Sequence, residues 1–272
     1  MTAETNKLLS QIQTYAKSDT VLAFSGGVDS ALLLFLLSRA CQETGSRVYA
    51  VTFHTALHPQ SDLNLARRLA KSMQASHHVL EVDEFSNPRI LENPPDRCYH
   101  CKKMLFEKLL GFARKRQVDV VLEGSNKDDL SVYRPGLQAV KELGVQSPLA
   151  QCGITKAQVR RLAAEYGLSV ATRPSVPCLA TRLPYGTPID TRLLARIDAV
   201  ERFLRELDFG DVRIRVHGDV ARLEIEPKDF PRLLAHRKEI LRQLKKLKLP
   251  YLTLDLEGFR SGSMDATLTD GE

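Results

Sequence analysis

The chain has 272 residues, of which 43% are hydrophobic and 26% charged, and this is enough to bury one large core or two smaller ones. No apolar run approaches the ~20 residues of a membrane span, and the first residues lack the basic and apolar parts of a signal peptide, so we expect a cytoplasmic protein with no membrane partner. The formal net charge is +6, but the lack of tryptophan and an aromatic content of 6% disfavour a nucleic-acid partner.

Strand-like and helix-like segments alternate through the first part of the chain. The predicted strands are Thr20–Phe24, Val48–Phe53, His78–Val82 and Val118–Leu122, and the predicted helices are 4–16, 30–41, 61–74 and 103–116. Continuous apolar strands separated by amphipathic helices are typical of a parallel sheet covered on both faces. We therefore predict an α/β fold with a doubly wound parallel sheet, which binds ligands at the carboxyl ends of its strands.

The segment FSGGVDS, residues 24 to 30, lies where the first predicted strand turns into a helix. Its glycines let the backbone approach a ligand closely, and the first N–H groups of a helix have no partner within that helix, so this turn predicts a phosphate site. The Gly-Lys-Ser/Thr ending of a Walker A loop is missing. Asp29 could place Mg²⁺ or only favour the helix dipole, and Ser25 could be a simple helix cap. The predicted phosphate contacts are Ser25, Gly26, Gly27, Asp29 and Ser30.

The end of the second predicted strand should border the same crevice, which takes the nucleoside in doubly wound folds. ATP is therefore the expected ligand, with Phe53 at that strand end and Gly124 after the fourth strand as further contacts. Acidic residues in EGSNKDD, residues 123 to 129, could position a metal ion or the ribose, or could merely be solvated loop residues.

Five cysteines in a cytosolic chain argue against a disulfide framework. Cys41 lies at the end of an apolar helix and is expected in the core, and Cys152 has no evident role. Cys98 and Cys101 form C-x-x-C, a spacing that lets two thiolates reach one metal ion or cluster. The pair could also be a redox dithiol, half of a zinc site or inert buried thiols, and Cys178 follows in a separate segment.

After a predicted helix at Lys156–Tyr166, the four prolines of segment 173–190 predict a loop that serves as site and linker. The remaining elements predict a smaller α+β unit, so we expect domains at 1–185 and 186–272 and a loose tail after Ser261. These elements are a helix at Thr191–Leu207, paired strands at Val212–Val216 and Arg222–Glu226, a helix at Pro231–Leu247 and a strand at Tyr251–Leu256.

Three motifs make the chain resemble the PP-loop ATP pyrophosphatases: SGGVDS after a strand, EGSNKDD after a later strand, and YRPG at 133–136. Further motifs resemble those of the LarE family of pyridinium-3,5-biscarboxylate mononucleotide sulfur transferases, which build a nickel-pincer cofactor for lactate racemase. They are DRCYHCKK at 96–103, the stretch 147–168, RPSVPCLATR at 173–182, the stretch 213–225 and DLEGFRSGSM at 255–264. This resemblance covers nearly the whole chain.

The resemblance implies that the enzyme adenylates a substrate carboxylate with ATP and Mg²⁺, releasing pyrophosphate, and that a sulfur nucleophile then displaces AMP. Asp29, Lys102 beside the cysteine pair, and Cys178 are the implied catalytic residues. In the family, some members sacrifice the sulfur of the cysteine that matches Cys178. Others carry all three cysteines, Cys98, Cys101 and Cys178, and hold a [4Fe–4S] cluster with an open iron; this chain has that pattern.

The same resemblance assigns the pyridinium mononucleotide to the C-terminal unit and implies a homo-oligomer, while the sulfur donor stays unidentified. Alternation along a strand predicts that Arg213 and Arg215 face one side and grip a phosphate or carboxylate, with Thr181 and Arg182 as further substrate contacts. Glu201, Glu224 and Asp229 are expected Mg²⁺ ligands, although Arg215 and Glu224 could instead form a surface cross-strand salt bridge.

Two other functions fit part of the pattern. Some PP-loop tRNA sulfurtransferases also combine C-x-x-C with a third cysteine, but the chain shows no recognisable RNA-binding domain. A domain that senses ATP without turnover would have the phosphate loop but no use for reactive cysteines.

Overall fold

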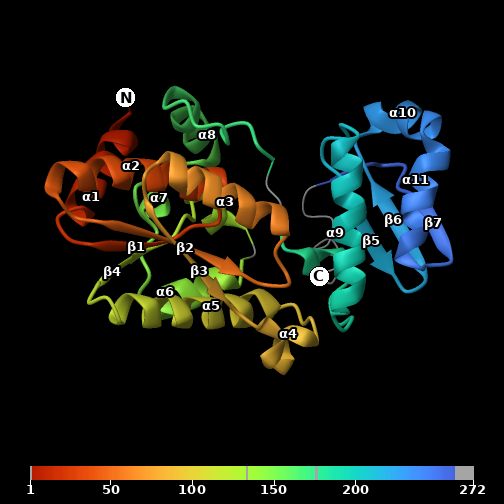
Figure 1. The fold of residues 1–272 in the computed structure, drawn as a ribbon, viewed down its shortest axis with the longest axis horizontal. Helices are drawn as coiled ribbons and strands as arrows, with labels where there is room; N and C mark the ends of the chain where they lie inside the picture. The colour runs from red at the N-terminus through yellow and green to blue at the C-terminus, as the bar shows by residue number, and fades with distance from the viewer. Residues whose placement is uncertain (1, 133, 175–176, 261–272) are drawn as a thin grey trace. The chain divides into compact units, whose positions relative to one another are not determined.

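The computed structural model describes residues 2–132, 134–174 and 177–260 (Figure 1). The chain forms two compact units, Met1–Ile90 with Asp96–Ser175, and Leu91–Pro95 with Val176–Glu272. The predicted boundary after residue 185 lies within the second of these units. Tyr133 of the motif at 133–136, residues 175–176 of the predicted loop and the predicted loose tail at 261–272 lie outside the described residues.

The first unit contains a four-stranded parallel sheet with strand order β3-β2-β1-β4, which confirms the predicted fold class. Because β2 and β4 flank β1 on opposite sides, the chain leaves β1 in one direction and later returns to its other side. The carboxyl end of β1 is therefore the topological switch point, where doubly wound folds bind ligands. The strands are β1 (Thr20–Ala23), β2 (Val48–His54), β3 (Ser76–Glu81) and β4 (Val120–Leu122).

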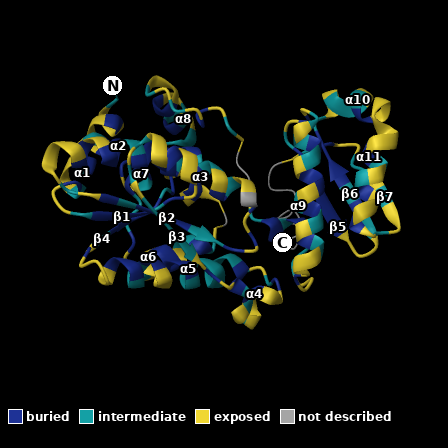
Figure 2. Ribbon diagram, in the orientation of Figure 1, coloured by how far each residue is buried: buried dark blue, intermediate teal, exposed yellow. Residues whose placement is uncertain are grey.

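Helices cover both faces of this sheet (Figure 1). On one face, α1, α2, α3 and α8 contribute to one core, and on the other α5 and α6 contribute to a second. Buried residues face the sheet from both layers (Figure 2). In the described residues no helix has the length and apolarity to cross a membrane. The helices are α1 (Ala3–Tyr15), α2 (Val28–Thr44), α3 (Gln60–Ser72), α4 (Pro88–Leu91), α5 (Arg97–Arg114), α6 (Gly136–Glu142), α7 (Pro148–Gln151) and α8 (Lys156–Glu165), with 3-10 turns η1 (Glu84–Ser86) and η2 (Lys127–Ser131).

Helix α5 begins earlier than predicted. The sequence placed its start near residue 103, because the apolar pattern of Leu105, Phe106, Leu109 and Phe112 begins there. The first turn is instead closed by the N–H of Tyr99, which donates to the carbonyl of Asp96 at 2.9 Å. The cysteine pair therefore lies on the first turns of a helix and not in a loop.

The second unit is the predicted smaller α+β unit. Its sheet has the order β5-β6-β7, with β5 and β6 antiparallel and β6 and β7 parallel. The helix predicted at Pro231–Leu247 is interrupted at His236, whose N–H closes the end of α10 by donating to the carbonyl of Arg232 at 3.1 Å. The elements are η3 (Leu179–Arg182), α9 (Thr191–Glu206), β5 (Arg213–His217), β6 (Val220–Glu224), η4 (Pro227–Asp229), α10 (Phe230–Ala235), α11 (Arg237–Leu244), η5 (Lys245–Leu247) and β7 (Tyr251–Leu254).

Candidate functional site

The predicted phosphate loop joins β1 to α2 in the first unit. Gly27 is the residue before the helix, and within the part of the chain that the structure describes no side chain caps the N-terminus of α2. Ser25 is therefore not the helix cap: its hydroxyl accepts from the Gly27 N–H at 3.3 Å and lies 3.2 Å from the Ser30 hydroxyl. A helix start without a side-chain cap at the carboxyl end of a central strand is suited to bind an anion.

Two glycines allow neighbouring backbone to approach this loop. Gly26 has a φ of +76°, and a Cβ there would lie 3.2 Å from backbone atoms of Ala66 in α3. A Cβ on Gly124, which follows β4, would lie 3.1 Å from the Ser30 nitrogen. Both predicted glycines thus border the loop, and neither has room for a side chain without a shift of its neighbours.

Asp29, in the first turn of α2, is held by two side chains that the sequence did not single out. Asn126 Nδ2 donates to Asp29 Oδ1 at 3.1 Å, and Lys156 Nζ pairs with Asp29 Oδ2. Lys156 is the first residue of α8, and its backbone N–H donates to Asp128 Oδ2 at 2.9 Å. A cation and an amide thus meet the carboxylate at the start of α2, where the phosphates of a nucleotide would bind.

The acidic residues after β4 do not form an open metal site. Glu123 is buried and accepts hydrogen bonds from the Ser125 N–H at 2.9 Å and the Ser125 hydroxyl at 2.8 Å, and another from the Ser147 hydroxyl. Burial raises the pKa of Glu123, but the charge of Lys102 and these hydrogen bonds outweigh it, so the pKa lies below its ordinary value. Asp129 closes a capping box with Asn126 and pairs with Arg134 at 3.0 Å.

The predicted catalytic Lys102 and the predicted nucleotide contact Phe53 lie in the layer between the sheet and α5. Lys102 Nζ lies 3.3 Å from Glu123 Oε2 and 5.3 Å from the ring centre of Phe106. The ring of Phe53, at the end of β2, lies 6.1 Å from the same Phe106 ring. Both residues are therefore partly occupied by contacts within the unit.

Cys98 and Cys101 are half-buried and one helical turn apart on α5, so both thiols can serve one metal group. Arg97 Nη2 lies 3.5 Å from Cys98 Sγ, and Cys101 Sγ donates to the buried carboxylate of Glu84 at 3.2 Å. His100 pairs with Asp96 at 3.0 Å and is engaged away from the thiols. The donor set fits two ligands of an iron–sulfur cluster.

The predicted metal ligands belong to different units. Cys98 and Cys101 belong to the first unit, and Cys178, Glu201, Glu224 and Asp229 belong to the second. In residues 2–132, 134–174 and 177–260, no three His, Cys, Asp or Glu side chains gather in a metal-binding group. The iron–sulfur and Mg²⁺ sites consequently remain predictions.

In the second unit, Cys178 is half-buried at the start of η3, and the side chains near it are paired internally. Arg182 and Glu201 form a bidentate ion pair, with Nε and Nη2 at 2.8 and 2.7 Å from the two carboxylate oxygens, and both side chains are 0% exposed. Glu201 also accepts from Arg205 at 2.7 Å and from the Ile214 N–H at 2.9 Å. Burial raises the pKa of Glu201, but the arginine charges outweigh it and the pKa is lowered.

Arg213 and Arg215 are both buried on β5. Arg215 Nε pairs with Glu224 at 2.7 Å, so the cross-strand salt bridge is present, but inside the unit instead of on its surface. Arg213 Nη1 donates to the Val212 carbonyl at 2.7 Å, and burial together with the charge of Arg182 lowers its pKa to about 10. Asp229 pairs with Arg232 at 3.1 Å.

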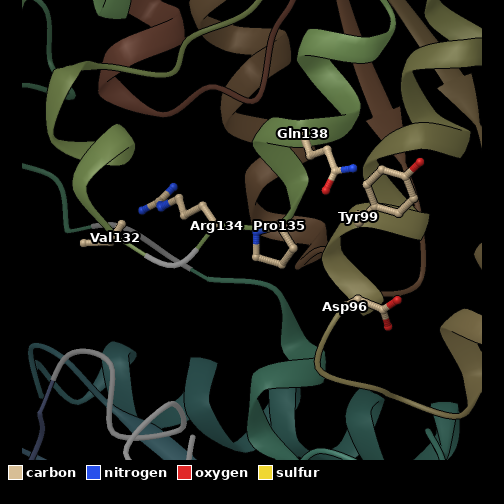
Figure 3. Close-up of a pocket in the computed structure, with 6 residues that line it drawn as sticks. All are labelled: Asp96, Tyr99, Val132, Arg134, Pro135 and Gln138. Atoms are coloured by element: carbon tan, nitrogen blue, oxygen red, sulfur yellow. The ribbon is translucent and has the colours of Figure 1, made fainter. Parts of the chain in front are cut away.

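A pocket of about 610 Å³ lies in the first unit, between the start of α5 and the segment that leads into α6 (Figure 3). The close-up shows the Tyr99 ring and the Gln138 amide on one side and Arg134 on the other. None of the predicted site residues lines it. The lining residues are Asp96, Tyr99, Val132, Arg134, Pro135 and Gln138.

Comparison with known proteins reveals relatives along nearly the whole chain. A PP-loop domain family matches residues 1–131. The pyridinium-3,5-bisthiocarboxylic acid mononucleotide synthase of Lactiplantibacillus plantarum is 37% identical over 252 residues, which cover 92% of this chain and 90% of that protein. The tRNA-specific 2-thiouridylase MnmA of Geotalea uraniireducens is 29% identical over 200 residues, covering 60% of this chain and 53% of that protein.

Among solved structures, the NMN synthetase from Francisella tularensis is similar with a TM-score of 0.50 and 15% identity, covering 64% of this chain and 76% of that chain. At this identity the likeness shows the fold alone. It agrees with the parallel sheet and the helices that flank it.

Proposed function

Because this chain belongs to the LarE family of PP-loop enzymes, together with the pyridinium-3,5-bisthiocarboxylic acid mononucleotide synthase of Lactiplantibacillus plantarum, we propose that it catalyses the same kind of reaction. The substrate is pyridinium-3,5-biscarboxylic acid mononucleotide, and its carboxylates become thiocarboxylates at the expense of ATP. The product serves the assembly of a nickel-pincer cofactor.

The observation that carries the proposal is the α2 N-terminus, which has no side-chain cap and lies beside Asp29, Asn126 and Lys156. The ATP phosphates bind the N–H groups of the loop. Asp29 would hold Mg²⁺, and Lys156 would exchange the Asp29 carboxylate for a phosphate oxygen. Such fixed positive charge stabilises pyrophosphate as it leaves.

The proposed reaction has two steps. A substrate carboxylate oxygen attacks the α-phosphorus of ATP, giving a mixed anhydride with AMP and releasing pyrophosphate. A hydrosulfide ion (HS⁻) then attacks the acyl carbon, the bond to the AMP oxygen breaks, and the products are a thiocarboxylate, AMP and a proton. Activation is needed because a bare carboxylate has no leaving group that sulfide can displace.

Cys98, Cys101 and Cys178 would hold a [4Fe–4S] cluster. When bound, a cluster held by three thiolates keeps one iron open, which can carry a sulfide. Support comes from the spacing of Cys98 and Cys101, which lie one turn apart on α5, and from the presence of a third half-buried thiol, Cys178. The competing use of Cys178, as a sulfur donor consumed in a single transfer, would leave the other two cysteines without a purpose.

Substrate binding by Arg213, Mg²⁺ binding by Asp229 and a cytoplasmic homo-oligomer remain parts of the proposal, whereas Arg182 and Arg215 are engaged by Glu201 and Glu224 within the unit. For Arg213, the test is a change to Gln: we expect weaker use of the mononucleotide, with ATP binding unchanged, since the residue lies outside the first unit. Equal loss of both would assign Arg213 to the nucleotide.

Thiolation of tRNA is the second candidate, favoured by the similarity to MnmA. That match leaves much of both chains uncovered, whereas the match to the mononucleotide synthase extends over 92% of this chain. The mononucleotide is therefore the better-supported substrate.

One assay separates the two functions. The anaerobically purified chain is incubated with ATP, Mg²⁺, sulfide and either the pyridinium mononucleotide or unmodified tRNA, and AMP, pyrophosphate and the product mass are followed. We expect sulfur in the mononucleotide, with AMP formed in equal amount. Sulfur in tRNA alone, or ATP cleavage without sulfur in either substrate, would refute the proposal.

A further inference from the structure

The turn that carries Cys178 is anchored through its main chain. The Cys178 carbonyl accepts from the Thr181 N–H at 3.1 Å, the Thr181 hydroxyl at 2.8 Å and Arg182 Nη1 at 3.4 Å. Arg182 Nη1 also reaches the Thr181 hydroxyl at 2.9 Å and the Pro177 carbonyl at 3.3 Å. These bonds fix the backbone on both sides of the thiol without using the sulfur atom.

Two buried carboxylates hold the arginines that make these contacts. Glu201 grips the Nε and Nη2 edge of Arg182, which leaves Nη1 aimed at the turn. Glu224 holds Arg215 Nε at 2.7 Å, while Arg215 Nη1 donates to the Thr181 carbonyl at 2.6 Å. A guanidinium that is clamped on one edge by a buried carboxylate presents its remaining donors in a fixed direction.

We infer that Thr181 and Arg182, supported by Glu201, are positioning residues that keep the turn 178–182 in one conformation and so fix where the Cys178 thiol is presented. The role of this anchoring in catalysis rests on the proposed function, in which the Cys178 thiol must bind the cluster. The anchoring itself is independent of the proposed function. Acceptors within the unit thus already engage Arg182 and Arg215, which the sequence assigned to the substrate.

The variant Thr181→Val tests the inference with little risk to folding, because valine has the shape of threonine without the hydroxyl. The full chain is treated with iodoacetamide in the absence of substrate, and the alkylation rate at each cysteine is followed by peptide mass spectrometry. We expect the rate at Cys178 to rise about fivefold to tenfold, as for the loss of roughly one hydrogen bond. Rates at Cys98 and Cys101 should not change, and Thr181→Ser should behave as wild type.

Two controls make the comparison specific. Thr253→Val removes a hydroxyl that also bonds a backbone carbonyl in the second unit, that of Ala221 at 3.3 Å. Arg205→Gln removes a partner of Glu201 that has no bond to the turn in the contacts described above. A rate at Cys178 within about twofold of wild type in Thr181→Val, or an equal rise in either control, would overturn the inference.

Kinetics then connect the anchoring to catalysis. In Thr181→Val, kcat for thiocarboxylate formation should fall while KM for ATP stays unchanged, since ATP binds the first unit; a raised KM for ATP with unchanged kcat would contradict a positioning role. If no variant, wild type included, thiolates the mononucleotide, the proposed function fails. The alkylation rates still decide whether the turn is anchored.

Discussion

The ion pair at the phosphate loop of the first unit is partly exposed, whereas the ion pair next to the Cys178 turn in the second unit is fully buried. Asp29 and Lys156 are 18% and 33% exposed, but Arg182 and Glu201 are both 0% exposed. An exposed ion pair contributes about 0–1 kcal/mol, so Lys156 can leave Asp29 for a phosphate at little cost. Removing one partner of a buried pair costs about 3–5 kcal/mol, so we expect Arg182 to stay paired with Glu201.

This difference separates residues that can change partners on ligand binding from residues that maintain a shape. The first unit has its charges ready for ATP. The second unit uses its charges to hold the turn of Cys178.

The largest effect is expected for Asp29→Asn. Formation of AMP and pyrophosphate should fall about a hundredfold or more, because the loop loses the charge that organises the metal ion, while the fold is retained. The matched control is Asp62→Asn, since Asp62 also lies in the first turn of a helix and pairs with Arg173 at 2.7 Å. Equal losses in both variants would mean that Asp29 acts only on the helix dipole.

The second-largest effect is expected on the free energy of unfolding of the second unit. Glu201→Gln should lower the free energy of unfolding by about 3 kcal/mol, because Arg182 is left buried without a counter-charge. Glu239→Gln in the same unit serves as control, since its ion pair with His236 is half-exposed, and about 0–0.5 kcal/mol is expected. Urea unfolding measures both. A similar small loss of unfolding free energy in both variants would show that the buried pair of Arg182 and Glu201 does not stabilise the unit.

Low pH should destabilise the wild-type chain in part as Glu201→Gln does, because it protonates Glu201. The pKa of Glu201 lies below its ordinary value of 4.5 in the folded chain. Its stabilisation is therefore complete above that value and is lost as the pH falls through the lowered pKa, because the unfolded chain takes up the proton first. Urea unfolding over this range should show a steeper fall for wild type than for Glu201→Gln. Identical slopes would argue against a charged Glu201.

The smallest effect concerns the glycine that borders the loop. Gly124→Ala should weaken ATP binding about threefold to tenfold, because the new Cβ would lie 3.1 Å from the Ser30 nitrogen and push the start of α2. Gly111→Ala in α5 meets nothing within 4 Å and should stabilise the chain by about 0.5–1 kcal/mol. Isothermal titration with a non-hydrolysable ATP analogue distinguishes them, and equal affinities would disprove close packing at Gly124.

The sequence predicted the strand, glycine turn and helix around FSGGVDS because their determinants are local. β1 ends just before this segment and α2 begins within it, as expected. Lys156 was missed because it meets Asp29 across 127 positions of sequence. The capping box of Thr155 explains why α8 begins there but not what its first side chain contacts.

In the second unit, alternation correctly predicted that Arg213 and Arg215 lie on one strand, but it did not predict their burial and could not separate residues that bind a ligand from residues that pair within the unit. An arginine that binds a phosphate and one that binds Glu224 look alike in a sequence. The register helps only in hindsight: Arg213 lies opposite Glu224, whereas the ion pair runs diagonally from Arg215. The prolines of segment 173–190 predicted a loop, so the short 3-10 turn η3 within it was missed.

The central claim is that the first unit activates the substrate while the second presents a Cys178 that is retained. Its most direct test is the mass of the peptide containing Cys178 after the anaerobically reconstituted chain has thiolated the mononucleotide with sulfide supplied. We predict more than one thiocarboxylate per chain and an unmodified cysteine. A single transfer per chain, with the peptide lighter by the mass of hydrogen sulfide, would contradict the claim and make Cys178 a consumed sulfur donor.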